Sequence, residues 1–278
     1  MTAPAWKSGD VTVEVGDDHV AVVEFHRPPD NFFDVTLVHD IADALAWVDD
    51  EGSARSVVLC SEGKNFCAGA SLGGGGLAGG ERVLNLYEEG IRIFESRRPI
   101  VVVVQGAAIG GGLGLALTGD FRVGASESRM SANFARLGFH QGFGLSATLP
   151  PIVGQQRALE MLYTGARLNG EQAHAIGLLE RLVPLEDVRA EAHRFAAEIA
   201  VSAPLSLLSI RETMRGDLAD KVRAATGREA HEQDILRETA DFAEGVKATA
   251  ERRTHSSKVA EGSTASRAGG TRRRGWPT

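Results

Sequence analysis

The chain has 278 residues, of which 43% are hydrophobic and 24% are charged. A chain of this length and composition can bury a full core, either as one domain with an appendage or as two domains. Its formal net charge of -7 argues against a protein that binds nucleic acid over its whole surface.

The two cysteines, Cys60 and Cys67, are too few for a disulfide scaffold and are not spaced as a CxxC motif. We read both as packing residues and expect a reducing cytoplasm. No apolar run approaches the roughly 20 residues that span a bilayer, and no apolar segment typical of a signal peptide appears after Met1, so we expect no secretory leader. The sequence therefore predicts a soluble cytoplasmic protein without a membrane partner.

The first third of the chain predicts a β-hairpin, a helix and a buried strand. Residues 11–15 and 20–25 alternate apolar positions around a Gly-Asp-Asp turn, which is typical of a hairpin. Apolar residues from Leu37 to Val48 follow at helical spacing, with Asp34 or Thr36 as the cap. The apolar run at 56–61 then indicates a buried strand, so we expect a βαβ crossover and a parallel α/β sheet.

A glycine-dense loop at residues 62–80 follows that strand. It contains a GxGxxG pattern at residues 74–79 and a GxSxG pattern around Ser71, but neither has the strand and helix context that a dinucleotide site or a nucleophile elbow needs. The loop has little side-chain polarity. It therefore suits backbone chemistry better than side-chain chemistry.

Residues 100–120 repeat the same arrangement after a predicted helix at 81–95. Five apolar residues run into a turn, and three glycines then open a segment of helix formers. The glycines either allow tight packing or let a ligand approach unpaired amides at the start of a helix. Two such loops could each present one backbone amide to the same point, which is a common way to build an oxyanion hole.

Helices are expected at about residues 185–202, 204–215 and 218–250. Beyond Arg253 the composition shifts to Ser, Gly, Ala and Arg, which cannot bury enough apolar surface to fold unaided. We therefore divide the chain into a core (1–195), a helical C-terminal region (196–253) and a basic, disordered tail (254–278).

Taken together, these segments resemble the crotonase superfamily, which contains the enoyl-CoA hydratases and isomerases. The resemblance covers roughly residues 11–253 and rests on five motifs, which are RPPDN (27–31), GKNFCAGASL (63–72), GAAIGGGLGLALTGDFRV (106–123), YTGARLNGEQAHAIGLLERLVP (163–184) and DFAEGVKA (241–248). It implies an α/β spiral of ββα units, a helical C-terminal trimerisation region, and a homotrimer or hexamer.

The resemblance also implies a site. The two oxyanion-hole amides of the family fall on Ala70 and Gly111. The main chain near Ala68 is where the family holds the adenine of coenzyme A, and Lys247 lies where the family contacts the phosphorylated ribose, in its own or a neighbouring subunit. The substrate would be an acyl-CoA or enoyl-CoA, with no cofactor beyond the coenzyme A of that thioester.

The sequence departs from the family at the two glutamates that hold water and move protons in hydratases. Those positions fall on Gly114 and Phe134, neither of which can transfer a proton. The nearest titratable residue is His140, which could act as acid and base near neutrality, or could pack on the ligand without moving a proton. The other histidines form no cluster with metal-site spacing, so no metal is expected.

Two functions remain open from the sequence. The first is an enzyme of the enoyl-CoA hydratase/isomerase type that stabilises a thioester enolate. The alternative is a catalytically silent acyl-CoA-binding protein with the same pocket.

Overall fold

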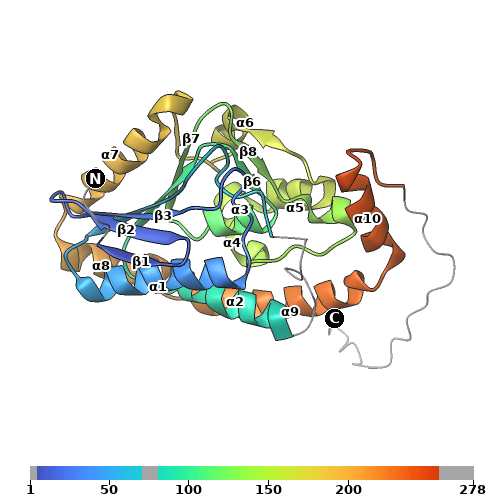
Figure 1. Ribbon diagram of the computed structural model, residues 1–278, viewed down its shortest axis with the longest axis horizontal. Helices are drawn as coiled ribbons and strands as arrows, with labels where there is room; N and C mark the ends of the chain where they lie inside the picture. Colours follow the sequence, from blue (N-terminus) through green and yellow to red (C-terminus); the bar gives the residue numbers. More distant parts are fainter. Residues whose placement is uncertain (1–4, 71–80, 257–278) are drawn as a thin grey trace, which may run out of the picture.

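The computed structural model describes residues 5–70 and 81–256. Its centre is a seven-stranded sheet in the order β1-β2-β3-β4-β5-β7-β10 (Figure 1). The first three strands pair antiparallel, and all pairs from β3 onwards are parallel. The strands are β1 (Trp6–Ser8), β2 (Val11–Val15), β3 (Val20–Phe25), β4 (Ser56–Ser61), β5 (Ile100–Val104), β7 (Phe121–Gly124) and β10 (Arg181–Leu182).

A smaller sheet of three strands lies next to the first, in the order β6-β8-β9. Its strands are β6 (Ala107–Ile109), β8 (Arg129–Ser131) and β9 (Leu168–Asn169). The predicted hairpin and the predicted parallel α/β arrangement are both confirmed, with α1 (Val35–Glu51) crossing from β3 to β4.

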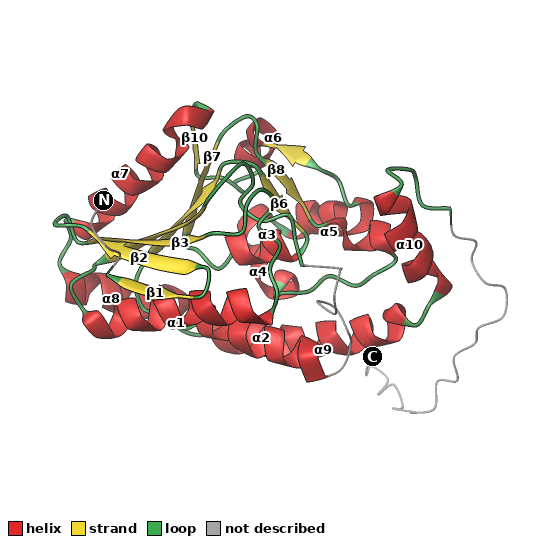
Figure 2. Cartoon of the chain, in the orientation of Figure 1, coloured by secondary structure: helices red, strands yellow, loops and turns green. Residues whose placement is uncertain are grey.

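Helices cover both faces of the large sheet, as Figure 2 shows. On one face, Val58, Cys60 and Val101 pack against α7 (Val188–Ala200). On the other face, Leu59 and Val102 belong to the main core with α1 and α2 (Glu81–Phe94). Every residue of β4 and β5 is buried, which explains why these strands are continuous apolar runs and do not alternate.

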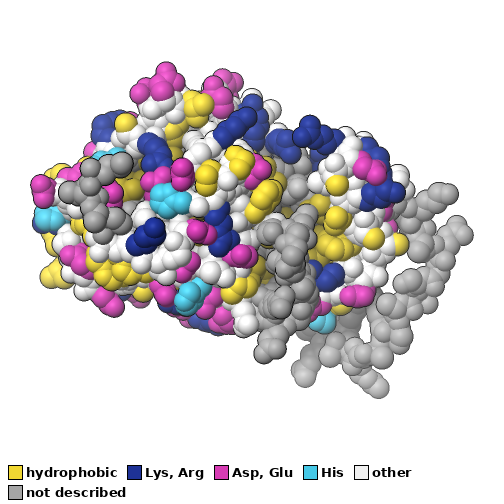
Figure 3. Space-filling view, in the orientation of Figure 1, with side chains coloured by type: hydrophobic (Ala, Val, Ile, Leu, Met, Phe, Trp, Pro, Cys, Tyr) yellow, Lys and Arg dark blue, Asp and Glu magenta, His cyan; other side chains and the backbone are white. Residues whose placement is uncertain are grey.

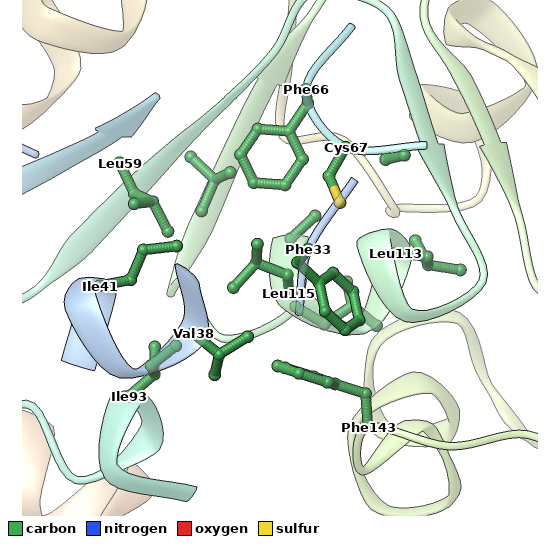
Figure 4. Close-up of a cluster of buried hydrophobic side chains, with 14 of the residues drawn as sticks. Phe33, Val38, Ile41, Leu59, Phe66, Cys67, Ile93, Leu113, Leu115 and Phe143 are labelled. Atoms are coloured by element: carbon green, nitrogen blue, oxygen red, sulfur yellow. The ribbon is translucent and has the colours of Figure 1, made fainter. Parts of the chain in front are cut away.

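The main core extends from α1 to the glycine-rich helix α3 (Gly111–Ala116). In Figure 4, Phe33 lies between Cys67 and Phe143, next to Leu113 and Leu115 of α3. The remaining helices are α4 (Leu145–Val153), α5 (Gln155–Thr164), α6 (Gly170–Ala175), α8 (Pro204–Arg215), α9 (Leu218–Arg237) and α10 (Ala240–Ala250), with short 3-10 helices η1 (Asn133–Leu137) and η2 (Leu185–Asp187).

The prediction of a single helix at 218–250 is wrong, because the structure has two helices there. α9 ends at Arg237, and Thr239 caps α10 by accepting a hydrogen bond from the amide of Phe242 at 3.2 Å. The apolar face of α9 packs within this chain against α2 and α4, where Val222 and Ala230 are buried. The break lets α10 turn away and pack against η1.

In the described part of the chain, no helix is both long enough and apolar enough to cross a membrane. The predicted tail lies outside the described residues from position 257 onwards.

Candidate active site

A cavity of about 750 Å³ lies where the two glycine-rich loops meet. On the face drawn in Figure 3, hydrophobic side chains gather beside the α10 end of the molecule. The cavity is lined by residues from the first loop, from the turn between β6 and α3, from α2 and from the segment 133–143. These include Ala68, Gly69, Ala70, Leu86, Tyr87, Gly110, Gly111, Asn133, Phe134, Leu137, Phe139, Gly142, Phe143 and Gln233.

The first loop is held against the segment that precedes α1. The side chain of Asn31 is fully buried and donates hydrogen bonds to the carbonyls of Glu62 at 2.8 Å and Asn65 at 2.7 Å. The amide of Phe33 donates to the carbonyl of Gly69 at 3.0 Å, and Phe33 and Ala70 form a parallel β-bridge. These bonds fix the backbone of the first loop at Ala70.

The second loop is joined to the first by backbone contacts. The amide of Cys67 donates to the carbonyl of Ala107 at 2.8 Å, and the amide of Ile109 donates to the carbonyl of Cys67 at 3.1 Å. A Cβ added to Gly112 would lie 2.1 Å from the carbonyl oxygen of Cys67. Glycine at this position is therefore what allows the two loops to touch.

Ala70 and Gly111 both line the cavity. Gly111 is the first residue of α3, so its amide has no acceptor within the helix. No described residue accepts a hydrogen bond from either amide. The cavity wall thus carries two backbone donors, one from each loop.

The wall near these donors is aromatic. The rings of Phe33 and Phe143 lie 5.3 Å apart, and a Cβ added to Gly114 would lie 2.7 Å from the Cβ of Phe143. Phe134 is 9% exposed and also lines the cavity. Of the two positions where the family resemblance implies a glutamate, Phe134 lines the cavity with an apolar ring, and Gly114 packs behind Phe143, which also lines it.

His140 and Lys247 are not among the residues that line the cavity. The Nδ1 atom of His140 is 2.8 Å from the carbonyl oxygen of Gln141, and the main-chain oxygen of His140 accepts a bond from Gln233. Lys247 is exposed on α10, where Thr249 reaches the cavity instead. Of the six predicted site residues, the structure therefore brings Ala68, Ala70, Gly111 and Phe134 together, and it leaves these two outside.

Sequence reasoning missed a polar pair on the cavity wall. The hydroxyl of Tyr87 donates to Oε1 of Gln233 at 2.7 Å, and a Cβ on Gly142 would lie 2.2 Å from that hydroxyl. Burial raises the pKa of Tyr87, so its phenol is neutral at physiological pH. The partners are 146 residues apart in the chain, so no local pattern could have found them.

Within residues 5–70 and 81–256, no group of three or more His, Cys, Asp or Glu side chains is placed to hold a metal ion.

The family model for enoyl-CoA hydratase/isomerase matches residues 16–258. The chain belongs to the enoyl-CoA hydratase/isomerase family. A probable enoyl-CoA hydratase of Bacillus subtilis is 30% identical over 243 residues, covering 85% of this chain and 94% of that protein. A putative enoyl-CoA hydratase of Thermus thermophilus is 33% identical over 258 residues, covering 87% of this chain and 98% of that protein.

Solved structures of the hydratase/isomerase family confirm the fold. The enoyl-CoA hydratase/isomerase of Pseudoalteromonas atlantica superposes with a TM-score of 0.80 at 28% identity, covering 90% of this chain and all of that chain. The predicted crotonase-like α/β fold is therefore confirmed, and the chain is an enzyme of the hydratase/isomerase family, which acts on acyl-CoA and enoyl-CoA substrates.

Proposed function

We propose that the cavity binds an acyl-CoA or enoyl-CoA with its thioester carbonyl oxygen between the amides of Ala70 and Gly111. The observation that carries this proposal is that both residues line one cavity and neither backbone amide has an acceptor among the described residues. Two such donors stabilise the enolate that forms when the α-carbon loses a proton. One donor of this kind contributes about 2.7 to 4 kcal/mol in other enzymes.

In this proposal, the phosphates of coenzyme A bind basic residues that line the cavity. Lys64, Arg129 and Arg167 are exposed there, and basic side chains bind phosphate groups. The amide of Ala68 already donates to the carbonyl of Asp30 at 2.9 Å, so the adenine would bind the carbonyl side of Ala68. Lys247 contacts the ribose phosphate in this proposal, from the same or a neighbouring subunit.

A homotrimer or hexamer is part of the same proposal. No residue of α8 is buried in the single chain. Leu205 and Met214 on that helix are 79% and 75% exposed, so α8 offers apolar surface to a second copy. No cofactor beyond the coenzyme A of the substrate is required.

The sequence offers one candidate for the residue that transfers the proton. Neither Gly114 nor Phe134 carries a carboxylate, so hydration by two carboxylates is not supported. His140 is the candidate acid and base from the sequence, although its ring lies off the described cavity wall. The apolar wall favours a second candidate function, which is a binding protein that holds acyl-CoA without turnover.

The experiment pairs binding with turnover over a panel of saturated and unsaturated acyl-CoA thioesters. Calorimetry gives Kd, and chromatography follows loss of each ester for the wild type and for His140→Ala. A matched control is His174→Ala, because the Nδ1 of His174 is also bonded to a backbone carbonyl, that of Leu179 at 2.9 Å. Turnover lost only in His140→Ala supports the enzyme with that residue as acid and base. Tight binding without turnover supports the silent binder, and failure of every thioester to bind contradicts the proposal.

A further inference from the structure

Asn133 is the first residue of η1 and precedes Phe134 on the cavity wall. Its side chain is only partly exposed, yet it makes no hydrogen bond with any described residue. By contrast, the side chain of Asn31 makes three hydrogen bonds, and that of Asn65 binds Asp30 and the amide of Ala107. Asn133 therefore presents an unpaired carboxamide to the cavity.

The carboxamide of Asn133 lies beside the turn that carries one of the two free amides. A Cβ added to Gly110 would lie 3.2 Å from Oδ1 of Asn133 and 3.7 Å from Cζ of Phe134. Gly110 comes immediately before Gly111, and because glycine has no Cβ this space stays open. The side chain of Asn133 is thus next to the position proposed for the thioester.

The backbone around Asn133 is fixed even though its side chain is free. The amide of Gly110 donates to the carbonyl of Ser131 at 2.8 Å, and the hydroxyl of Ser131 donates to the carbonyl of Gly165 at 3.2 Å. These bonds tie β8 to both neighbouring segments. These bonds fix the backbone next to Asn133, so the base of the side chain has a defined position while the carboxamide keeps its rotational freedom to meet a ligand.

The carboxamide of Asn133 is partly exposed, so its hydrogen-bonding groups are available to a ligand that enters the cavity. The side chain can donate two hydrogen bonds and accept two, and it does not titrate. It can hold an oxygen atom, but it cannot replace the missing carboxylates in proton transfer.

We propose that the Asn133 carboxamide binds an oxygen substituent on the acyl chain, on the carbons next to the thioester, and so determines a preference for oxygenated acyl groups. This inference rests on the proposed function, because the thioester must sit against Ala70 and Gly111. Asn133 is then a substrate-contacting residue that sets specificity.

The test compares butyryl-CoA with 3-hydroxybutyryl-CoA, which differ only by one hydroxyl group. Calorimetry gives the ratio of their Kd values for the full chain and for Asn133→Ala and Asn133→Leu, the second of which keeps the side-chain size. Gln141→Ala is the control, because Gln141 is a nearby amide that bonds Ser146 and does not line the cavity.

In the wild type and the control, the hydroxylated ester should bind about five- to tenfold more tightly, as expected for one hydrogen bond in a confined site. In both Asn133 variants the ratio should fall to about one, with the Kd of butyryl-CoA nearly unchanged. A ratio that survives in Asn133→Ala overturns the inference, as does an equal loss for both esters. If neither ester binds the wild type, the proposed function itself has failed and this inference falls with it.

Discussion

Phe143 occupies the space that a side chain at Gly114 would need. A Cβ at Gly114 would lie 2.7 Å from the Cβ of Phe143 and 3.1 Å from its carbonyl oxygen. Phe143 itself has a positive φ of 58°, which is unusual for a residue with a side chain. The absence of a side chain at position 114 is therefore coupled to the placement of Phe143, which fills the space that such a side chain would need.

This contact predicts a non-additive effect on stability. Gly114→Ala should destabilise the wild type by about 1 to 3 kcal/mol, since it overpacks a filled site. In a Phe143→Gly background the same change should cost clearly less, because the nearest clashing atom is gone. Urea unfolding of the wild type, the two single variants and the double variant gives the coupling free energy between positions 114 and 143.

The control for that cycle is Gly227→Ala in α9. A Cβ there meets nothing within 4 Å, so the change should be neutral or stabilise the helix by up to about 1 kcal/mol. Equal costs of Gly114→Ala in both backgrounds would contradict the packing account.

Glu229 predicts a pH-dependent stability. Its buried carboxylate accepts hydrogen bonds from the amides of Gly144 and Ser146, both at 2.9 Å, and burial raises the pKa of Glu229. A folded-state pKa above the unfolded value gives a contribution that is complete below the unfolded pKa and is lost as pH rises through the folded pKa. The wild type should therefore lose stability relative to Glu229→Gln as the pH rises from the ordinary pKa of a glutamate, 4.5, through the raised pKa of Glu229.

Urea unfolding at intervals of half a pH unit measures this difference. The account expects the free energy of unfolding of Glu229→Gln, minus that of the wild type, to rise with pH. A difference that is constant, or that falls with pH, would show that the two amide bonds outweigh burial.

Cys60 and Cys67 should be unreactive in the folded protein. Both are buried, and burial raises the pKa of each thiol to about 12, so very little thiolate exists at pH 8. A disulfide reagent such as Ellman's should label neither thiol within an hour under native conditions and both in denaturant. Rapid labelling of the native protein would mean that the core next to the first loop opens readily.

The sequence predicted the elements whose pattern is local. The hairpin of β2 and β3 and the buried strands β4 and β5 follow from residue spacing within a few positions. The sequence left the cap of α1 between Asp34 and Thr36, and the structure shows that it is Asp34. The two glycine-rich loops were predicted to present backbone amides, because glycine has no side chain to cover the main chain. The family resemblance then identified Ala70 and Gly111.

Features that depend on distant contacts could not be predicted in this way. The bond between Tyr87 and Gln233 and the packing of Phe143 on Gly114 join segments that only the fold brings together. His140 was chosen by its distance along the chain, which says nothing about the direction of its ring. The helix break at Thr239, by contrast, is marked by a local capping residue, and the expected single helix ran through it.

The most direct test of the paired donors is the infrared band of a bound thioester carbonyl. Butyryl-CoA carrying ¹³C at the carbonyl carbon is compared free, bound to the wild type, and bound to Ala70→Pro, which lacks one N–H. The account predicts a shift to lower wavenumber on binding the wild type and a clearly smaller shift in the variant. A bound ester whose carbonyl band stays where it is in water, or shifts equally in both proteins, would contradict it.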